Sequence, residues 1–147
     1  MPLQAVAVQD DEARIEIDPT LQAGLRDLDG FSHIIVVSHL HQSTAGGLEV
    51  VPFLDDKPRG VFATRSPRHP NPIGLSIVRL LQVEGTTLQV SGLDLLDGTP
   101  ILDIKPYVPT IDHADAERIG WLEGRVDAFH TTRADDRFDG QGDQDDR

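Results

Sequence analysis

The sequence predicts a mainly β protein: a small antiparallel β-barrel with a short N-terminal helix and a C-terminal helix. Three observations support this fold class. Several short runs are rich in β-branched residues, turn-forming dipeptides separate them at close spacing, and no long helical pattern alternates with them. The chain has 147 residues, the size of one ordinary domain.

The N-terminal part is predicted to be a strand followed by a short helix. Apolar residues alternate within residues 4–17, most clearly in Arg14–Ile17, and a period of two is typical of a strand. Asp18 can cap a helix and Pro19 suits its first position, so a short helix that ends near Gly30 is expected.

The middle of the chain is predicted to hold the other strands. Residues 31–41 form an apolar run with many β-branched side chains, which is typical of a buried strand. A long Gly- and Pro-containing loop follows, with a short strand at 48–53. Further strands are expected at residues 60–64, 73–84, 87–93 and 100–104, with turns at Glu84–Gly85 and Asp97–Gly98.

The C-terminal part is predicted to be a helix over residues 114–130. Ile119, Leu122, Val126 and Phe129 recur at steps of three and four, which places them on one helix face. The sequence therefore predicts one barrel domain over residues 1–133, followed by an acidic, disordered tail at 134–147.

Composition excludes several classes of protein. The chain has 13 Lys and Arg against 25 Asp and Glu, a net charge of −12, which excludes a general basic coat for nucleic acid. It has no cysteine, which excludes disulfides, thiolate nucleophiles and Cys-ligated zinc. No apolar run approaches the roughly 18 residues of a membrane helix, and no secretory signal is present at the N-terminus. We therefore expect a cytoplasmic protein without a membrane partner.

A metal site is not predicted. His39 and His41 share one face of the expected strand at 31–41 and could begin a zinc site. No third ligand is indicated near them in the sequence.

One region departs from the acidic composition. Residues 57–83 contain no Asp or Glu, and their basic side chains are Lys57, Arg59, Arg65, Arg68, His69 and Arg79. Two interpretations are open. These side chains either pair with carboxylates elsewhere in the fold, or they form an anion site for a carboxylate, a phosphate or RNA.

The same region contains a stiff loop. Pro67, Pro70 and Pro72 fix their own φ angles and push the residues before them toward extended conformations. Such a loop is either a rigid connector or a preorganised binding site, and the presence of Arg65, Arg68 and Asn71 in it favours a binding site.

Residues 60–76, Gly-Val-Phe-Ala-Thr-Arg-Ser-Pro-Arg-His-Pro-Asn-Pro-Ile-Gly-Leu-Ser, closely resemble the signature of the TsaA-like family. Three further blocks agree with that family, at residues 25–34, 39–42 and 93–109, so the resemblance covers roughly residues 15–110 in collinear order. In two places the chain departs from the family: His69 stands where Arg is usual, and no Pro-Arg-Gln-type segment precedes Ala13.

The resemblance implies a small antiparallel barrel that binds S-adenosylmethionine near a homodimer interface. Carried over by motif, the implied cofactor-binding residues are His41, Gln42, Arg65, Ser66, Asn71, Leu75, Leu93, Asp94, Leu95 and Leu96. Methyl transfer to nitrogen also requires loss of a proton, and Asp94 or Asp103 could accept it. Lys105 and Tyr107 could instead orient the acceptor, and the sequence does not select among these four candidate catalytic residues.

The implied function is an S-adenosylmethionine-dependent methyltransferase that acts on the threonylcarbamoyladenosine beside the tRNA anticodon. Two alternatives stay open: a methyltransferase of the same fold with a small-molecule acceptor, and a non-catalytic module that binds S-adenosylmethionine. The net charge of −12 argues against tRNA as the partner and favours the small-molecule acceptor.

Overall fold

The computed structural model describes residues 3–7, 12–44, 46–53 and 55–125. The chain divides into two compact units. The first consists of Met1–Ser43 and Pro72–Asp112, and the second of Thr44–Asn71 and His113–Arg147. Each unit is described separately below.

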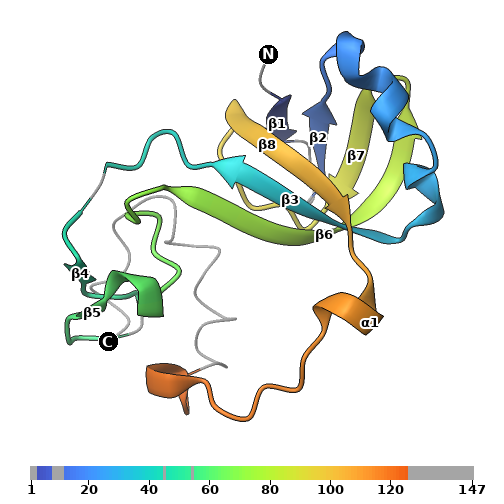
Figure 1. The fold of residues 1–147 in the computed structure, drawn as a ribbon. Coiled ribbons are helices and arrows are strands. Elements are labelled where there is room, and N and C mark those ends of the chain that lie inside the picture. Colours follow the sequence, from blue (N-terminus) through green and yellow to red (C-terminus); the bar gives the residue numbers. More distant parts are fainter. Residues whose placement is uncertain (1–2, 8–11, 45, 54, 126–147) are drawn as a thin grey trace. The chain divides into compact units, whose positions relative to one another are not determined.

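The first unit is built from antiparallel strands (Figure 1). They are β1 (Leu3–Ala7), β2 (Glu12–Glu16), β3 (His33–His39), β6 (Ile73–Glu84), β7 (Thr87–Ser91) and β8 (Thr99–Pro106). They pair in the order β1-β2-β7-β6-β3-β8, and β8 pairs back onto β1, so the pairings close into a barrel. The predicted class, mainly β with antiparallel pairing, is confirmed.

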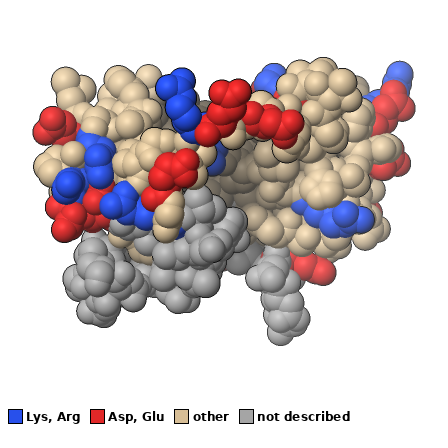
Figure 2. Space-filling model, turned by 90° about the horizontal axis from the view of Figure 1, so that it is seen from below, with Lys and Arg blue, Asp and Glu red and all other residues tan. Residues whose placement is uncertain are grey.

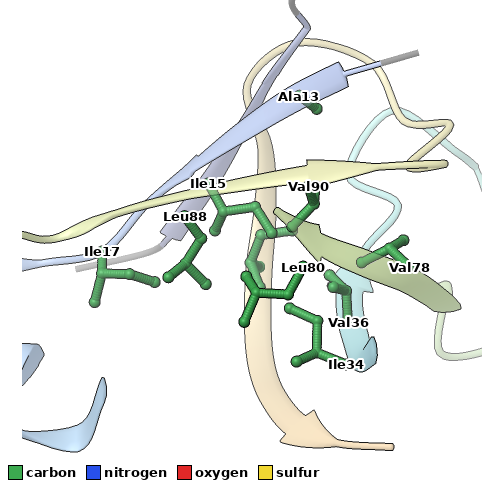
Figure 3. Close-up of a cluster of buried hydrophobic side chains, with 10 residues drawn as sticks. Ala13, Ile15, Ile17, Ile34, Val36, Val78, Leu80, Leu88 and Val90 are labelled. Atoms are coloured by element: carbon green, nitrogen blue, oxygen red, sulfur yellow. The ribbon is translucent and has the colours of Figure 1, made fainter. Parts of the chain in front are cut away.

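The core of the first unit lies on the inner face of these strands. In β3 the inward positions Ile34 and Val36 are fully buried, while the residues between them are half-buried. This alternation follows from the two-residue repeat of a strand. The other buried apolar side chains of the cluster in Figure 3 are Ala13, Ile15, Ile17, Val78, Leu80, Leu88, Val90 and Ile101.

Both predicted turns are present. Gly85 has a φ of 63° between β6 and β7, and Gly98 has a φ of 81° before β8. Both glycines occupy the left-handed region, which a residue without a Cβ enters at little cost.

The N-terminal helix differs from its prediction. Asp18 is the N-cap and accepts a hydrogen bond from the backbone N–H of Thr20, as expected, but the helix at Pro19–Leu25 is 3₁₀. A second, one-turn 3₁₀ helix follows at Leu28–Gly30. One continuous helix is excluded because Asp27, which precedes this second helix, adopts a φ of 70°.

The second unit contains two short strands, β4 (Glu49–Val50) and β5 (Arg59–Gly60), which pair with each other. The strand predicted over 60–64 is wrong, because a 3₁₀ turn occupies Val61–Ala63. The backbone N–H and the hydroxyl of Thr64 both donate to the carbonyl of Val61, and this local pairing takes the place of a strand ladder.

The predicted C-terminal helix is also wrong in its described part. The first unit ends in a one-turn helix, α1 (Pro109–Asp112), and the second unit has a 3₁₀ turn at Gly120–Leu122. Gly120 and Gly124 have φ angles of 60° and 78°, which interrupt a right-handed helix. The remaining residues of the proposed helix face, Val126 and Phe129, and the predicted tail lie outside the described residues.

None of the helices in the described ranges has the length and apolarity that crossing a membrane would require.

Candidate functional site

The predicted cofactor residues of the first unit gather at one end of the barrel. β3 finishes at His39, which is paired with Ile73, the first residue of β6. The chain then turns, with the backbone N–H of Leu40 donating to the Pro72 carbonyl at 2.7 Å, and exposes His41 and Gln42. We call this the His39 end of the barrel (Figure 1).

The loop between β7 and β8 reaches the same end. β8 begins at Thr99, and Ile101 is paired with Ser38 of β3. Residues 93–96 therefore arrive at the His39 end. Within this loop Leu93 and Leu95 pack against the core, and Asp94 is half-buried.

A buried hydroxyl lies at this end of the barrel. Ser38 is fully buried, and its Oγ has no hydrogen-bond partner among the described residues. A Cβ atom on Gly74, which is paired with Ser38, would lie 2.5 Å from that Oγ and 3.2 Å from Cδ2 of Leu40. The close approach of β6 to β3 at this point therefore requires glycine.

Asp103 and Lys105, two of the four candidate catalytic residues, bind each other. The Nζ of Lys105 lies 2.9 Å from Oδ2 of Asp103, and both side chains are about half exposed or more. The hydrogen bond from Lys105 holds the pKa of Asp103 below its ordinary value, and the backbone N–H of Ile104 acts in the same direction. A carboxylate stabilised in its charged form is a weaker base.

Tyr107 lies at the opposite end of the barrel from His41. Its backbone N–H donates to the carbonyl of His33, the first residue of β3, at 3.1 Å, and the two rings are 6.4 Å apart. His39 lies six positions after His33 along β3, a length of about 20 Å at the usual strand rise. Of the four candidates, Asp94 is the one in the loop that reaches the His39 end.

A shallow hollow in the first unit lies toward the Tyr107 end. It has a volume of about 220 Å³. None of the predicted cofactor residues is among those that line it, which are Gly24, Leu25, Arg26, Asp27, Leu28, Phe31, Ile104 and Pro106.

In the second unit, the Pro-rich loop is held by its own side chains. The backbone N–H of Ser66 donates to the hydroxyl of Thr64 at 3.3 Å, and the N–H of Arg68 donates to the hydroxyl of Ser66 at 3.1 Å. Nε2 of His69 lies 2.9 Å from the Thr64 carbonyl. These bonds fix the stretch that carries Arg65, as the preorganised-loop interpretation expects.

A second set of contacts anchors the loop to residues 121–125. The indole N–H of Trp121 donates to the Ala63 carbonyl at 2.8 Å, and the Arg59 guanidinium lies 5.6 Å from the centre of the Trp121 ring. Arg59 in turn binds Asp55, with Nε 2.5 Å from Oδ2, and Arg125 lies 3.8 Å from the same carboxylate.

Asp55 is a functional-site residue that sequence reasoning missed. Its side chain is buried, with 4% of the residue exposed, and the hydrogen bond from Arg59 lowers its pKa. The indole N–H of the single tryptophan of the chain restrains the loop through its bond to Ala63. The sequence could have indicated one of these partners, Arg59, because it stands only four residues after Asp55.

The two interpretations of the basic region now apply to different residues. Arg59 is paired with a carboxylate, as the first interpretation expects. Arg65 and Arg68 are exposed and form no ion pair within the described ranges. Figure 2 shows basic and acidic side chains mixed on one face of the molecule.

No group of three or more potential metal ligands occurs among the residues that the structure describes. The rings of His39 and His41 lie 6.5 Å apart.

The chain is similar to proteins of one family. The family model described as "tRNA-methyltransferase O N-terminal domain" matches residues 1–113. A probable S-adenosyl-L-methionine-binding protein of Pyrococcus abyssi is 48% identical over 138 residues, which cover 94% of this chain and 75% of that protein. The tRNA (adenine(37)-N6)-methyltransferase of Escherichia coli is 45% identical over 102 residues, which cover 63% of this chain and 43% of the enzyme.

Solved structures of the same family are similar to this chain. A crystal structure of TrmO superimposes with a TM-score of 0.62 and 41% identity, covering 75% of this chain and 48% of that chain. The structure of TrmO from Pseudomonas aeruginosa superimposes with a TM-score of 0.65 and 33% identity, and the match covers 83% of this chain and 60% of that chain. The chain thus spans less than two thirds of the solved structures and of the Escherichia coli enzyme.

Proposed function

Because the chain belongs to the tRNA-methyltransferase O N-terminal domain family, we propose that it is an S-adenosylmethionine-dependent methyltransferase. Its proposed acceptor is the threonylcarbamoyladenosine beside the tRNA anticodon. The observation that carries this proposal is Arg65, an exposed arginine on a loop fixed by internal hydrogen bonds, with no carboxylate bound to it among the described residues.

The residues present suit the chemistry of this cofactor, which supplies the methyl group when bound. Arg65 offers a guanidinium for the methionine carboxylate. His41 and Gln42 offer polar groups for the nucleoside, and Leu75 offers apolar surface. Loop 93–96 contributes backbone groups, but the carbonyl of Leu96 is already engaged by the N–H and hydroxyl of Thr99. Ser66 and Asn71 complete the proposed binding set.

Among the four candidate catalytic residues, Asp94 is the proposed proton acceptor. It belongs to the loop that reaches the His39 end, where His41 and Gln42 lie. Asp103 is a weaker base because Lys105 stabilises its charged form. Lys105 is proposed to orient the acceptor molecule, whereas Tyr107, at the opposite end of the barrel from His41, is left out of this role.

The proposal is tested by incubating the purified protein with tRNA that carries threonylcarbamoyladenosine beside the anticodon, without its methyl group, and with S-adenosylmethionine carrying an isotopic methyl label. Digestion and mass analysis should find the label on the nucleoside beside the anticodon. Arg65→Gln should lower cofactor affinity at least tenfold, since charge-assisted hydrogen bonds are the stronger class. The matched control is Arg118→Gln, another exposed arginine. A tRNA that stays unlabelled would contradict the proposed acceptor.

Two further functions have specific support. The net charge of −12 favours a small-molecule acceptor over tRNA. The 48%-identical Pyrococcus abyssi relative is described as a probable binding protein, which favours a non-catalytic module. Label found in a metabolite extract would identify a small-molecule acceptor. Tight cofactor binding without any labelled product would identify a non-catalytic module.

We also propose that the protein forms a homodimer through the outer face of β6. The outward side chains Ile73, Leu75 and Ile77 are each more than half exposed, as is Leu102 of β8. This surface contains no acidic residue of β6 before Glu84, and its one charged side chain in that range is Arg79. In a chain of net charge −12, two copies associate with least repulsion through an apolar face without acidic residues. The cytoplasmic location stays a prediction.

A further inference from the structure

Phe62 is an exposed aromatic residue that the second unit holds in position. The 3₁₀ turn at Val61–Ala63 buries Val61 to 1% exposure and leaves Phe62 76% exposed. The ring of His69 lies 5.9 Å from the Phe62 ring at 61°, and His69 is itself bonded to the Thr64 carbonyl. The His69 ring holds one side of the Phe62 ring, and the exposed remainder is available for stacking with a planar group.

The surroundings of Phe62 are cationic. Arg65 and Arg68 follow it in the same loop, both exposed and neither ion-paired within the described part of the chain. The sequence from Lys57 to Val83 contains no acidic residue. In a chain of net charge −12 this local excess of positive charge is complementary to a polyanion, not to an average protein surface.

We propose that Phe62 and His69 form a stacking site for an unpaired RNA base, with Arg68 contacting the adjacent phosphate. An exposed aromatic ring beside basic side chains is the arrangement by which proteins hold single-stranded nucleic acid. Arg68 is chosen for the phosphate because Arg65 is already assigned to the cofactor. This inference rests on the proposed function, since it identifies where a base of the acceptor RNA would lie.

The loop is suited to this task by its rigidity. The hydrogen bonds of Ser66 and Arg68 and the indole bond from Trp121 to Ala63 hold both ends of the Phe62–Arg68 stretch. A surface ordered before binding loses little conformational entropy when a base stacks on it.

The test measures binding of a fluorescein-labelled RNA hairpin with a seven-nucleotide anticodon-type loop (a stem-loop of the tRNA kind), together with calorimetric titration of S-adenosylmethionine. Phe62→Leu keeps the apolar bulk but removes the aromatic face, and should weaken RNA binding about tenfold. Phe62→Trp should restore it. Arg68→Gln should reduce the slope of log Kd against log salt by about one. The control is Leu48→Ala, an equally exposed apolar residue of the same unit, which should change nothing.

The outcomes separate this inference from the proposed function. If the wild type methylates tRNA and Phe62→Leu binds the hairpin as tightly, the stacking site is wrong and the function stands. If hairpin binding depends on Phe62 but no RNA is methylated, the stacking site stands and the proposed acceptor is wrong. A wild type that does not bind the hairpin overturns the stacking site, and the labelling of intact tRNA then decides the proposed function separately. A Phe62→Leu variant that changes only the oligomeric state overturns the stacking site, because a second copy then covers Phe62.

Discussion

Ser38 and Gly74 face each other across the pairing of β3 with β6, and the Ser38 hydroxyl fills the space that a side chain on Gly74 would need. The hydroxyl is fully buried and has no hydrogen-bond partner in the described ranges. The two residues therefore fix how closely the strands approach at the His39 end of the barrel.

Gly74→Ala should destabilise the barrel by about 1–3 kcal/mol, the usual cost of overpacking. The new Cβ would lie 2.5 Å from Oγ of Ser38, and the pairing of β6 with β3 would have to shift to relieve the contact. Urea unfolding followed by circular dichroism measures this loss. Ser38→Ala in the same chain should recover part of it, because the clashing oxygen is removed. Gly24→Ala, where nothing lies within 4 Å, is the control; an equal loss there would refute the steric explanation.

Trp121→Phe should loosen the Pro-rich loop while leaving the barrel intact. The substitution keeps a ring for the Arg59 guanidinium but removes the donor to the Ala63 carbonyl, a bond worth about 1 kcal/mol. Amide hydrogen exchange should therefore speed up about fivefold around residues 63–66. Trp121→Leu, which also removes the ring, should have a larger effect. Unchanged exchange in both variants would mean that the indole does not restrain the loop.

Asp55 should make the second unit sensitive to acid. Arg59 holds the pKa of Asp55 below the ordinary value of 3.8, so its stabilising contribution is complete above that value and is lost as pH falls through the lowered pKa. Asp55→Asn cannot ionise. Urea unfolding of the wild type and of this variant is followed by the fluorescence of the single tryptophan. The difference between their unfolding midpoints should be constant above pH ~5 and shrink below pH ~4.

The matched control for this experiment is Asp56→Asn, at the exposed neighbouring position. The difference between its unfolding midpoint and that of the wild type should not shrink between pH ~5 and pH ~4. A constant difference for Asp55→Asn down to pH 2 would argue that the ion pair with Arg59 contributes nothing.

Ile77→Glu should convert the proposed dimer to a monomer without unfolding it. Ile77 lies in the middle of the outer face of β6 and is 54% exposed, so the carboxylate is tolerated in the monomer but repels its copy across a symmetric interface. Sedimentation velocity measures the change. Ile111→Glu, at a residue that is 78% exposed in the one-turn helix α1, should leave the oligomeric state unaltered. A wild type that sediments as a monomer would rule out the interface.

The strands were predictable from the sequence because their signal is local. Alternation in Arg14–Ile17, the apolar run before His39 and the glycine turns at Gly85 and Gly98 all act within a few residues. The C-terminal helix was mispredicted for the complementary reason. Its apolar spacing is helical, but Gly120 and Gly124 adopt left-handed angles that a count of apolar positions does not register.

The candidate site was predictable only in part. Motif resemblance named Arg65, and the structure adds that Arg65, unlike Arg59, has no acidic partner among the described residues. The sequence could not predict that the four candidate catalytic residues lie far apart in the fold. The positions of Asp94 and Tyr107 depend on pairing between strands that are distant in sequence. The ion pair of Asp55 with Arg125 is equally non-local.

The anchoring of the Pro-rich loop has a consequence for where this protein can be cut. A chain shortened to the 113 residues that the family model matches would retain every strand of the barrel. It would lack Trp121 and Arg125, so Ala63 would lose its indole donor and Asp55 one of its two arginines. Such a truncated protein would keep the barrel strands but lose both restraints, so amide hydrogen exchange in its Pro-rich loop should be faster than in the intact chain.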